Sequence, residues 1–593
     1  MKGSKFLRLF AVLLALTLIA AACGGGGGDD EAAPGTQEVP EEDIPQGGTL
    51  RIAGVSDVDY MDPGAMYYTV SWFLARGVFR TLVTYPAVAD FEEQNQLVPD
   101  LAEDVGQANE DQTQWTYTLK EGVTYGPGLG GEEVPGVTGE PVKSEDIKYA
   151  IERLFNPSVG AGYPNYYEDI EGVKEFQDGD AEEITGIETP DDQTIVFNLS
   201  KPVGDWDFRM AMPAASPVPR AAAEKYDKKK DSDYDKHVVG TGPYYVAEWT
   251  PEEQITLERN ENWDAETDDV REAYIDTVDW KLGLDNDVGV KKILNGDYEL
   301  GLDVSPQGPA LEQVVNDPEL KQRMINEPSL CTRYVWLNTT VKPFDDPLVR
   351  EAVNYAIDRA NIKRVFGGPI TGPIATSVVP PGMTGHLPTE EYNPFPSPNL
   401  AGDMEKAKEL MAEAGYENGF DEEVLFVGAS DPPHDKIAET VRSDLEELGF
   451  TNLNVKTPAF PNQYTQFYSV PSKNVGIGTS AGWCKDYNDA FTFLDPLFHG
   501  RNIRDSGNYN YSELDDSALN EAIDSAAALS GDERVEAWEN ANRLATESGV
   551  WVPWSWDNET IIYSEALVNP IYNTFFSHVD YVVAGVNGGA AAQ

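Results

Sequence analysis

The chain has 593 residues, of which 102 are Asp or Glu and 43 are Lys or Arg, so its formal net charge at pH 7 is −59. Such a charge excludes nucleic acid and anionic membrane surfaces as binding partners, because both are themselves negative. The acidic residues indicate a solvated surface of the kind used by salt-adapted organisms, with a funnel for basic ligands as the alternative.

The first 22 residues have the layout of a secretory signal peptide. Three basic residues precede an apolar run from Leu9 to about Ala22, and Cys23 follows. The run is shorter than the roughly 20 residues of a membrane-spanning helix, and no later stretch is long and apolar enough to span a bilayer. Residues 20–23 (AAAC) resemble the lipobox of bacterial lipoproteins, which implies that Cys23 is lipidated. Ala20 departs from the usual Leu, and plain secretion is the alternative.

A flexible tether is predicted next. Five glycines, Gly24–Gly28, lead into an acidic stretch with prolines that reaches about Gln46. This composition cannot bury a core, so residues 23–45 are interpreted as a tether. The roughly 545 residues that remain exceed what one core usually organises, and two or three domains are expected.

The rest of the chain alternates strand-like runs with amphipathic helices, as in an α/β protein. Ser144 is expected to cap a helix over 143–155, and Pro347 to occupy the first position of a helix that begins at Asp346. The predicted strands are 49–54, 81–85, 115–119 and 194–199, and the other predicted helices are 72–79 and 403–414.

A βαβ unit is predicted from strand 424–427, helix 435–448 with Gly449 as its C-cap, and strand 453–456. The loop after the first strand of such a unit faces a ligand crevice. Ser430, Asp431 and His434 are therefore expected at the functional edge.

Two short motifs are interpreted as coincidental. Residues 478–482 (GTSAG) match the nucleophile elbow of α/β-hydrolases around Ser480, but a bulky, irregular run follows instead of a helix. Residues 126–131 (GPGLGG) match a dinucleotide-binding motif, yet no helix opens after them. Metal-binding spacings are absent from the sequence, so no metal and no cofactor are expected.

Two cysteines remain after Cys23, in a compartment that favours disulfides. Cys331 and Cys484 are expected to be joined, with two buried free thiols as the alternative.

Several segments together resemble bacterial solute-binding protein family 5, the extracytoplasmic receptors of oligopeptide, dipeptide and nickel ABC transporters. The similarity covers nearly the whole mature chain, in the order of the family. The segments are 97–102 (LVPDLA), 116–119, 141–146 (PVKSED), 216–220 (SPVPR), 240–244 (GTGPY), 257–260 (LERN), 343–359 and 407–416.

The segment 482–488 (GWCKDYN) resembles the oligopeptide-binding branch in particular. The resemblance implies that Cys484 pairs with Cys331 and that Asp486 receives the α-amino group of a peptide. It also implies that Trp483 lines a side-chain pocket, that His434 lies near the carboxyl end of the peptide, and that Tyr464 is an aromatic pocket residue. Tyr67 and Tyr68 are further candidates for an apolar wall.

The chain departs from the family pattern in two places. Ser480 stands where oligopeptide receptors can have an Arg directed toward the ligand carboxylate, and a longer loop spans about 126–140.

The resemblance implies a two-lobed α/β fold of the periplasmic-binding-protein kind (type II, large peptide-binding class) with an extra inserted subdomain. It suggests a first lobe built from 46–80, 201–330 and 549–593, an inserted subdomain over 81–200, and a second lobe over 331–548.

The expected function is a monomeric, lipid-anchored, extracytoplasmic receptor that captures an oligopeptide and passes it to the permease of an ABC importer. A receptor of the same class for a dipeptide, a nickel complex, haem or an oligosaccharide is the first alternative. A secreted serine hydrolase that uses Ser480 and a purely structural surface lipoprotein are the others.

Overall fold

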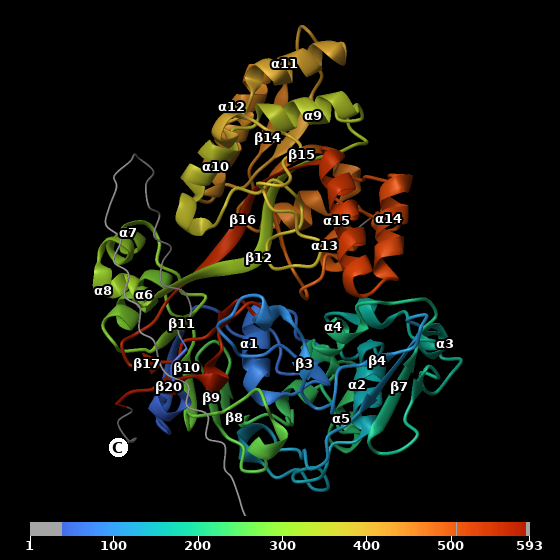
Figure 1. Cartoon of the computed structure of the whole chain (residues 1–593), viewed down its shortest axis with the longest axis vertical. Helices are drawn as coiled ribbons and strands as arrows, with labels where there is room; N and C mark the ends of the chain where they lie inside the picture. The colour runs from blue at the N-terminus through green and yellow to red at the C-terminus, as the bar shows by residue number, and fades with distance from the viewer. Residues whose placement is uncertain (1–37, 506, 589–593) are drawn as a thin grey trace, which may run out of the picture.

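The computed structural model describes residues 38–505 and 507–588, and the chain forms two lobes, one above the other in Figure 1. The predicted signal peptide, Cys23 and most of the predicted tether lie outside the described residues. Within the described part of the chain, no helix is long and apolar enough to cross a membrane.

The lower lobe is built on a mixed five-stranded sheet in the order β11-β1-β10-β9-β8. The predicted strand 49–54 is confirmed as β1, which pairs in parallel with both β10 and β11. The strands are β1 (Thr49–Gly54), β8 (Tyr244–Thr250), β9 (Gln254–Arg259), β10 (Thr277–Lys281) and β11 (Leu300–Leu302), and the helices around them are α1 (Thr69–Val78), α6 (Asn286–Leu294), α7 (Gly308–Asn316) and α8 (Pro318–Lys321).

A second, four-stranded sheet, in the order β4-β5-β7-β6, lies beside the first in the lower lobe (Figure 1). The sequence predicted its two central strands, and predicted 81–85 as extended, where the structure has β2. The elements of this region are β2 (Val83–Thr84), β3 (Val98–Pro99), β4 (Gln107–Ala108), β5 (Gln114–Thr118), β6 (Ile187–Glu188), β7 (Thr194–Asn198), α2 (Ser144–Leu154), α3 (Val173–Asp178), α4 (Trp206–Met210) and α5 (Arg220–Asp227).

The predicted role of Ser144 as a helix cap is wrong. Helix α2 begins at Ser144 itself, and the backbone N–H of Lys143 donates to the Asp146 carboxylate at 3.0 Å. The Ser144 hydroxyl donates to the carbonyl oxygen of Asp191 at 2.6 Å. A tertiary contact therefore uses the hydroxyl that local sequence assigns to capping.

The upper lobe is built on a five-stranded sheet in the order β14-β13-β15-β12-β16. Its strands are β12 (Met324–Leu337), β13 (Val424–Val427), β14 (Leu453–Lys456), β15 (Val475–Cys484) and β16 (Trp551–Ile562). Its helices are α9 (Pro347–Ala356), α10 (Arg359–Phe366), α11 (Met404–Glu413), α12 (His434–Leu448), α13 (Phe491–Phe498), α14 (Ser517–Ala527) and α15 (Gly531–Glu547).

The predicted βαβ unit is confirmed as β13, α12 and β14. The two strands pair in parallel, and the apolar stripe of α12, including Val441 and Leu445, is buried against the sheet. Gly449 ends the helix with a φ of 113°, a conformation that favours glycine because it has no Cβ. Helix α9 likewise begins at Pro347, as predicted, and the Asp346 carboxylate accepts from the N–H of Leu348 at 2.9 Å.

The long strands β12 and β16 run between the two lobes (Figure 1). They pair antiparallel from Met324–Ile562 at one end to Trp336–Trp551 at the other. A β-bridge between Leu300 and Tyr563 connects the end of β16 to β11 in the lower sheet. The lower lobe ends with the short strands β17 (Leu567–Val568), β18 (Tyr572–Asn573), β19 (His578–Val579) and β20 (Gly585–Val586). The residue limits suggested for the lobes and for the inserted subdomain stay predictions.

Candidate functional site

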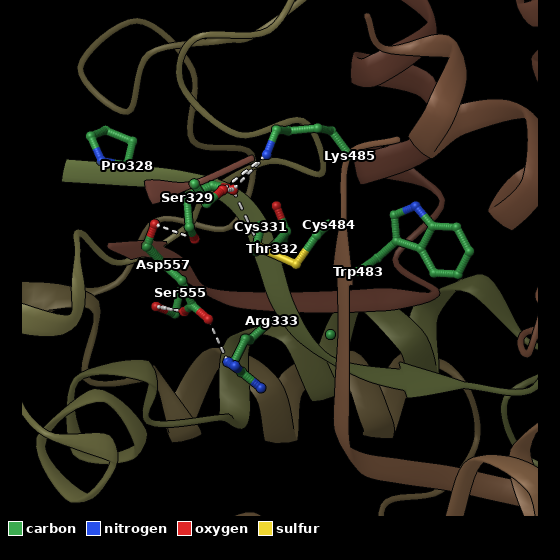
Figure 2. The surroundings of a disulfide bond; sticks show 12 residues. Pro328, Ser329, Cys331, Thr332, Arg333, Trp483, Cys484, Lys485, Ser555 and Asp557 are labelled. Atoms are coloured by element: carbon green, nitrogen blue, oxygen red, sulfur yellow. Dashed lines mark hydrogen bonds and ion pairs between the residues drawn. A yellow bond between two sulfur atoms is a disulfide. The ribbon is translucent and has the colours of Figure 1, made fainter. Parts of the chain in front are cut away.

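The site is organised by the antiparallel pairing of β12 with β15. Cys331 stands opposite Cys484 in this pair, and the structure joins them by a disulfide with a Cα–Cα distance of 4.0 Å. Figure 2 shows the bridge together with Trp483 and Lys485, the two sequence neighbours of Cys484. The pairing predicted for the two cysteines is thus present, and it fixes the end of β15 where the candidate ligand-binding residues begin.

Two adjoining cavities lie between the lobes. The smaller has a volume of about 410 Å³ and the larger about 740 Å³. Both take residues from the lower and the upper lobe. The residues that line both of them are Tyr67, Thr69, Tyr163, Cys484 and Lys485. Because these residues are shared, the two cavities form one continuous cleft that passes the disulfide.

Asp486 lines the smaller cavity and is partly buried. Its carboxylate accepts a hydrogen bond from the hydroxyl of Tyr166, which comes from the lower lobe. Burial raises the pKa of Asp486 to about 6, while Tyr166 and the charge of Lys485 act in the opposite direction. Among the described residues no cation lies within ion-pair distance of this carboxylate, so the cleft contains a desolvated acid suited to a positive guest.

Lys485 supplies a cation next to this acid. Its ammonium donates to the Ser577 hydroxyl at 3.0 Å and to the Ser329 carbonyl at 3.4 Å, so its hydrogen-bond partners are neutral. Burial lowers the pKa of Lys485 to about 7, although the charge of Asp486 acts against this. Ser577 belongs to the lower lobe, and Lys485 therefore links the lobes at the centre of the cleft.

Aromatic side chains form the walls of the smaller cavity. The ring of Tyr67 stacks on that of Tyr163 with centroids 5.0 Å apart, and Tyr67 and Tyr68 keep 45% and 59% of their surface exposed. Trp483 donates from its indole nitrogen to the carbonyl of Thr492 at 2.9 Å, which fixes the ring at the cavity wall. Three predicted aromatic residues are therefore brought together around Asp486.

The loop that carries Asp486 is fixed by its neighbour Tyr487. The Tyr487 hydroxyl donates to the Asp205 carboxylate at 2.5 Å, and Asp205 also accepts from Arg209 at 3.1 Å in the lower lobe. In the upper lobe, Arg534 forms two hydrogen bonds with Asp489, at 2.7 and 2.8 Å. This buried network on both sides of the lobe interface holds residues 486–489 against the lower lobe.

His434 and Tyr464 line neither cavity. His434 is the first residue of α12, stacks on Phe460 at 4.6 Å, and has a pKa lowered to about 4 by burial and then by the charge of Arg333. The Tyr464 hydroxyl accepts from the backbone N–H of Gly482 at 3.1 Å. Both residues lie behind the cleft wall near Arg333, while Pro432 and Pro433, directly before His434, line the larger cavity.

The structure gives Ser480 no hydrolase geometry. Ser480 lies inside β15 instead of at a strand-to-helix turn, and only 3% of its surface is exposed. Two histidines that follow Ser480 in the sequence have other contacts: His499 accepts from the N–H of Arg501 at 3.1 Å, and His578 contacts the carbonyl of Gly301 at 2.7 Å. The G-x-S-x-G match is a segment of sheet.

Sequence reasoning missed several cleft residues. Lys485 directly precedes Asp486 and Arg333 lies two residues after Cys331, so these positions in the sequence were a usable signal. Tyr163 and Tyr166 come from a part of the lower lobe more than 300 residues earlier in the chain, and Tyr166 meets Asp486 across a sequence separation of 320. Nothing local to residues 163–166 indicates such a contact.

The profile of one protein family, described as bacterial extracellular solute-binding proteins, family 5 Middle, matches residues 96–505. Glutathione-binding protein GsiB of Salmonella typhi is 25% identical over 512 residues, which cover 85% of this chain and 88% of that protein. Heme-binding protein A of Haemophilus influenzae is 26% identical over 483 residues, with coverages of 79% and 81%.

Solved structures are similar over almost the whole chain. Clavulanic acid biosynthesis oligopeptide binding protein 2 superposes with a TM-score of 0.83 and 30% identity, covering 91% of this chain and 96% of that one. DppA of Helicobacter pylori, in complex with the peptide STSA, has a TM-score of 0.67 and 22% identity, with coverages of 91% and 99%. The latter likeness concerns the fold alone.

Proposed function

Because the chain belongs to family 5 of the bacterial extracellular solute-binding proteins, the solute-binding receptors of ABC importers, we propose that its solute is a short peptide. The peptide occupies the cleft between the lobes and is delivered to the permease of the importer. Asp486 carries this proposal, because its carboxylate lines the cavity and lacks a cationic partner among the described residues.

The free amino group of a peptide supplies the cationic hydrogen-bond partner that the Asp486 carboxylate lacks among the described residues. A hydrogen bond to a charged group contributes about 1.5 to 3 kcal/mol, and an unpaired buried charge is costly. The ammonium is common to all unblocked peptides, so binding through Asp486 accepts many sequences. Main-chain hydrogen bonds and the aromatic wall of Tyr67, Tyr68 and Trp483 supply the remaining contacts.

Ligand capture involves closure of the lobes about the two strands that join them. β12 and β16 are the crossings, and rigid-body rotation about such strands is a common way to enclose a ligand. Tyr166 and Lys485 contribute hydrogen bonds between the lobes around the cleft. The closed form is the one that the permease recognises.

The protein is exported and held at the outer face of the cytoplasmic membrane, or in the periplasm, through lipidated Cys23. The basic, apolar and Cys-containing start of the chain supports this. It acts as a monomer, because one chain contains both walls of the cleft.

The relatives named above bind different solutes by their names: glutathione in one case and heme in the other. Glutathione is a tripeptide with a free ammonium group, which suits a carboxylate such as Asp486. Heme has no ammonium group, and the desolvated acid therefore favours the peptide class.

Native mass spectrometry of the purified full-length protein tests the proposal. A co-purified set of masses that fit short peptides supports it, as does a rise in melting temperature with added tripeptides. A single porphyrin, metal or sugar mass in the cleft, with no response to peptides, overturns it.

A further inference from the structure

Arg333 is a half-buried cation that lines the larger cavity. It comes from β12 and stands opposite Gly482 of β15, and 28% of its side chain is exposed. Its Nε donates to the Asp557 carboxylate at 2.5 Å. Among the described residues, its two terminal nitrogens have no hydrogen-bond partner, so the donors of one edge of the guanidinium stay available to a guest.

The orientation of this guanidinium is fixed from two sides. Its guanidinium carbon lies over the ring of Phe366, 4.9 Å from the ring centroid. Asp557 is itself held by the Ser555 hydroxyl at 2.8 Å, and Ser555 accepts from Lys363 at 2.5 Å. Figure 2 shows Arg333 beside Ser555 and Asp557, with Lys485 on the other side of the disulfide. A guanidinium fixed in this way is suited to bidentate binding of a carboxylate.

We propose that Arg333 binds the C-terminal carboxylate of the peptide, while Asp486 binds its amino end. This inference rests on the proposed function, since it assigns the second end of the same ligand. The cleft is continuous from Asp486, past Tyr67, Tyr163 and the disulfide, to Arg333. A zwitterionic ligand laid along it meets an acid at one end and a base at the other.

The strand register sets an upper limit on the length of a ligand that binds both anchors. Asp486 lies four residues beyond Gly482, the residue opposite Arg333. At about 3.3 Å per residue of extended chain, the Cα atoms of Gly482 and Asp486 are at most about 13 Å apart, and Arg333 lies across the strand pair, about 5 Å from Gly482. An extended peptide has the same rise, so the two anchors can be bridged by a peptide of at most about six residues.

Lys485 is the competing carboxylate ligand. It adjoins Asp486 in the sequence and lies nearer the amino end of the cleft, and its ammonium already has Ser577 and Ser329 as partners. Arg333 is better suited, because a guanidinium keeps its charge at every physiological pH and presents parallel donors. The charged groups around Arg333 are Asp557, Glu559, Lys363 and, behind the wall, His434.

The test uses a random tripeptide library with free C-termini and the same library as C-terminal amides. The two libraries compete for binding to the full-length protein, and native mass spectrometry measures how much of each is bound. We expect the free acids to be bound about 10- to 100-fold better by the wild type, in line with charge-assisted hydrogen bonds. Arg333→Gln should reduce the ratio to near 1. Arg364→Gln is the matched control, because Arg364 is an exposed arginine of α10. This variant should keep the wild-type ratio.

If Arg333→Gln does not fold, Arg333→Lys takes its place. Lysine keeps the positive charge but lacks the paired donors of a guanidinium, so its preference for acids over amides should lie between those of the wild type and of no preference. In libraries of two to ten residues, the preference for free acids should be lost beyond about six residues. Equal binding of acids and amides by the wild type overturns the inference, as does a ratio that follows Lys485→Gln instead of Arg333→Gln. In both cases peptide binding itself, and the proposed function, stand. If no library binds, the proposed function fails.

Discussion

The hydroxyl of Tyr166 donates a hydrogen bond to the carboxylate of Asp486, and the two residues belong to different lobes. The acid proposed to bind the ligand is therefore also a contact between the lobes. Since a carboxylate can accept several hydrogen bonds, an incoming ammonium can share it with Tyr166. The same carboxylate therefore takes part in both ligand binding and the contact between the lobes.

Replacing Asp486 with Asn should weaken all peptides with a free amino group. The neutral amide loses the charge-assisted bond of about 1.5 to 3 kcal/mol, so affinity should fall about 10- to 100-fold in isothermal titration. Asp421→Asn, the same change at an exposed position of the upper lobe, should have no effect. An equal affinity of Asp486→Asn and wild type would remove Asp486 from the site.

Binding should depend on pH through Asp486. Burial raises its pKa to about 6, so in the unliganded protein this acid is most favourable to stability below about pH 4, and that contribution is lost as the pH rises through 6. A peptide ammonium binds the ionised form, and its affinity should therefore fall as the pH drops below 6. The effect approaches tenfold per pH unit.

Titrations between pH 5.0 and 7.5 measure this dependence, and Asp486→Asn should flatten it. Lys485, whose pKa is lowered to about 7, is the nearest other group that titrates in this range, followed in the larger cavity by Glu559, whose pKa burial raises to about 7. A slope that persists in Asp486→Asn and disappears in Lys485→Gln or Glu559→Gln would assign the dependence to those groups.

Tyr166→Phe should move the pH midpoint upward. The Tyr166 hydroxyl stabilises the ionised carboxylate, and its removal leaves burial to act with less opposition. The midpoint of the affinity curve should rise, while peptide binding at pH 8 is kept. Tyr60→Phe, at an exposed tyrosine that lines neither cavity, serves as the control, and an identical curve for Tyr166→Phe would contradict the contact.

The disulfide should contribute to stability more than to ligand recognition. Cys331 and Cys484 close a loop with a sequence separation of 153 residues, for which chain entropy gives an upper value of about 5 kcal/mol. The double variant Cys331→Ser with Cys484→Ser should have a lower free energy of unfolding in urea. The β12–β15 register remains without the bridge, and peptide affinity should change little. Reduced wild type should reproduce the effect.

Ser480→Ala should keep peptide binding, and the wild type should hydrolyse no ester substrate. Ser480 lies in the middle of a strand with its hydroxyl buried, and within the described part of the chain no histidine forms a hydrogen bond with that hydroxyl. A chromogenic ester assay checks the wild type and the variant together. Ester turnover that disappears in Ser480→Ala would restore the hydrolase hypothesis.

Helices and strands with a strong local sequence pattern could be predicted from the sequence. The βαβ unit over 424–456 was predicted to within a residue at its strands, because the apolar stripe of α12, the terminal Gly449 and the flanking strands are all properties of neighbouring residues. The family, the two-lobed fold and the segment that contains Cys484 and Asp486 were also evident from the sequence.

What only the tertiary structure decided is which distant residues meet. The Ser144 hydroxyl binds the carbonyl of Asp191 instead of capping the helix. His434 is the buried first residue of α12, behind the cleft wall. The surroundings of Asp486 are assembled from Tyr166, 320 residues away, and Arg333 is directed into the cavity by Asp557, 224 residues away. Local periodicity determines helices, strands and their buried faces, whereas a cleft between lobes depends on contacts that no neighbouring residues encode.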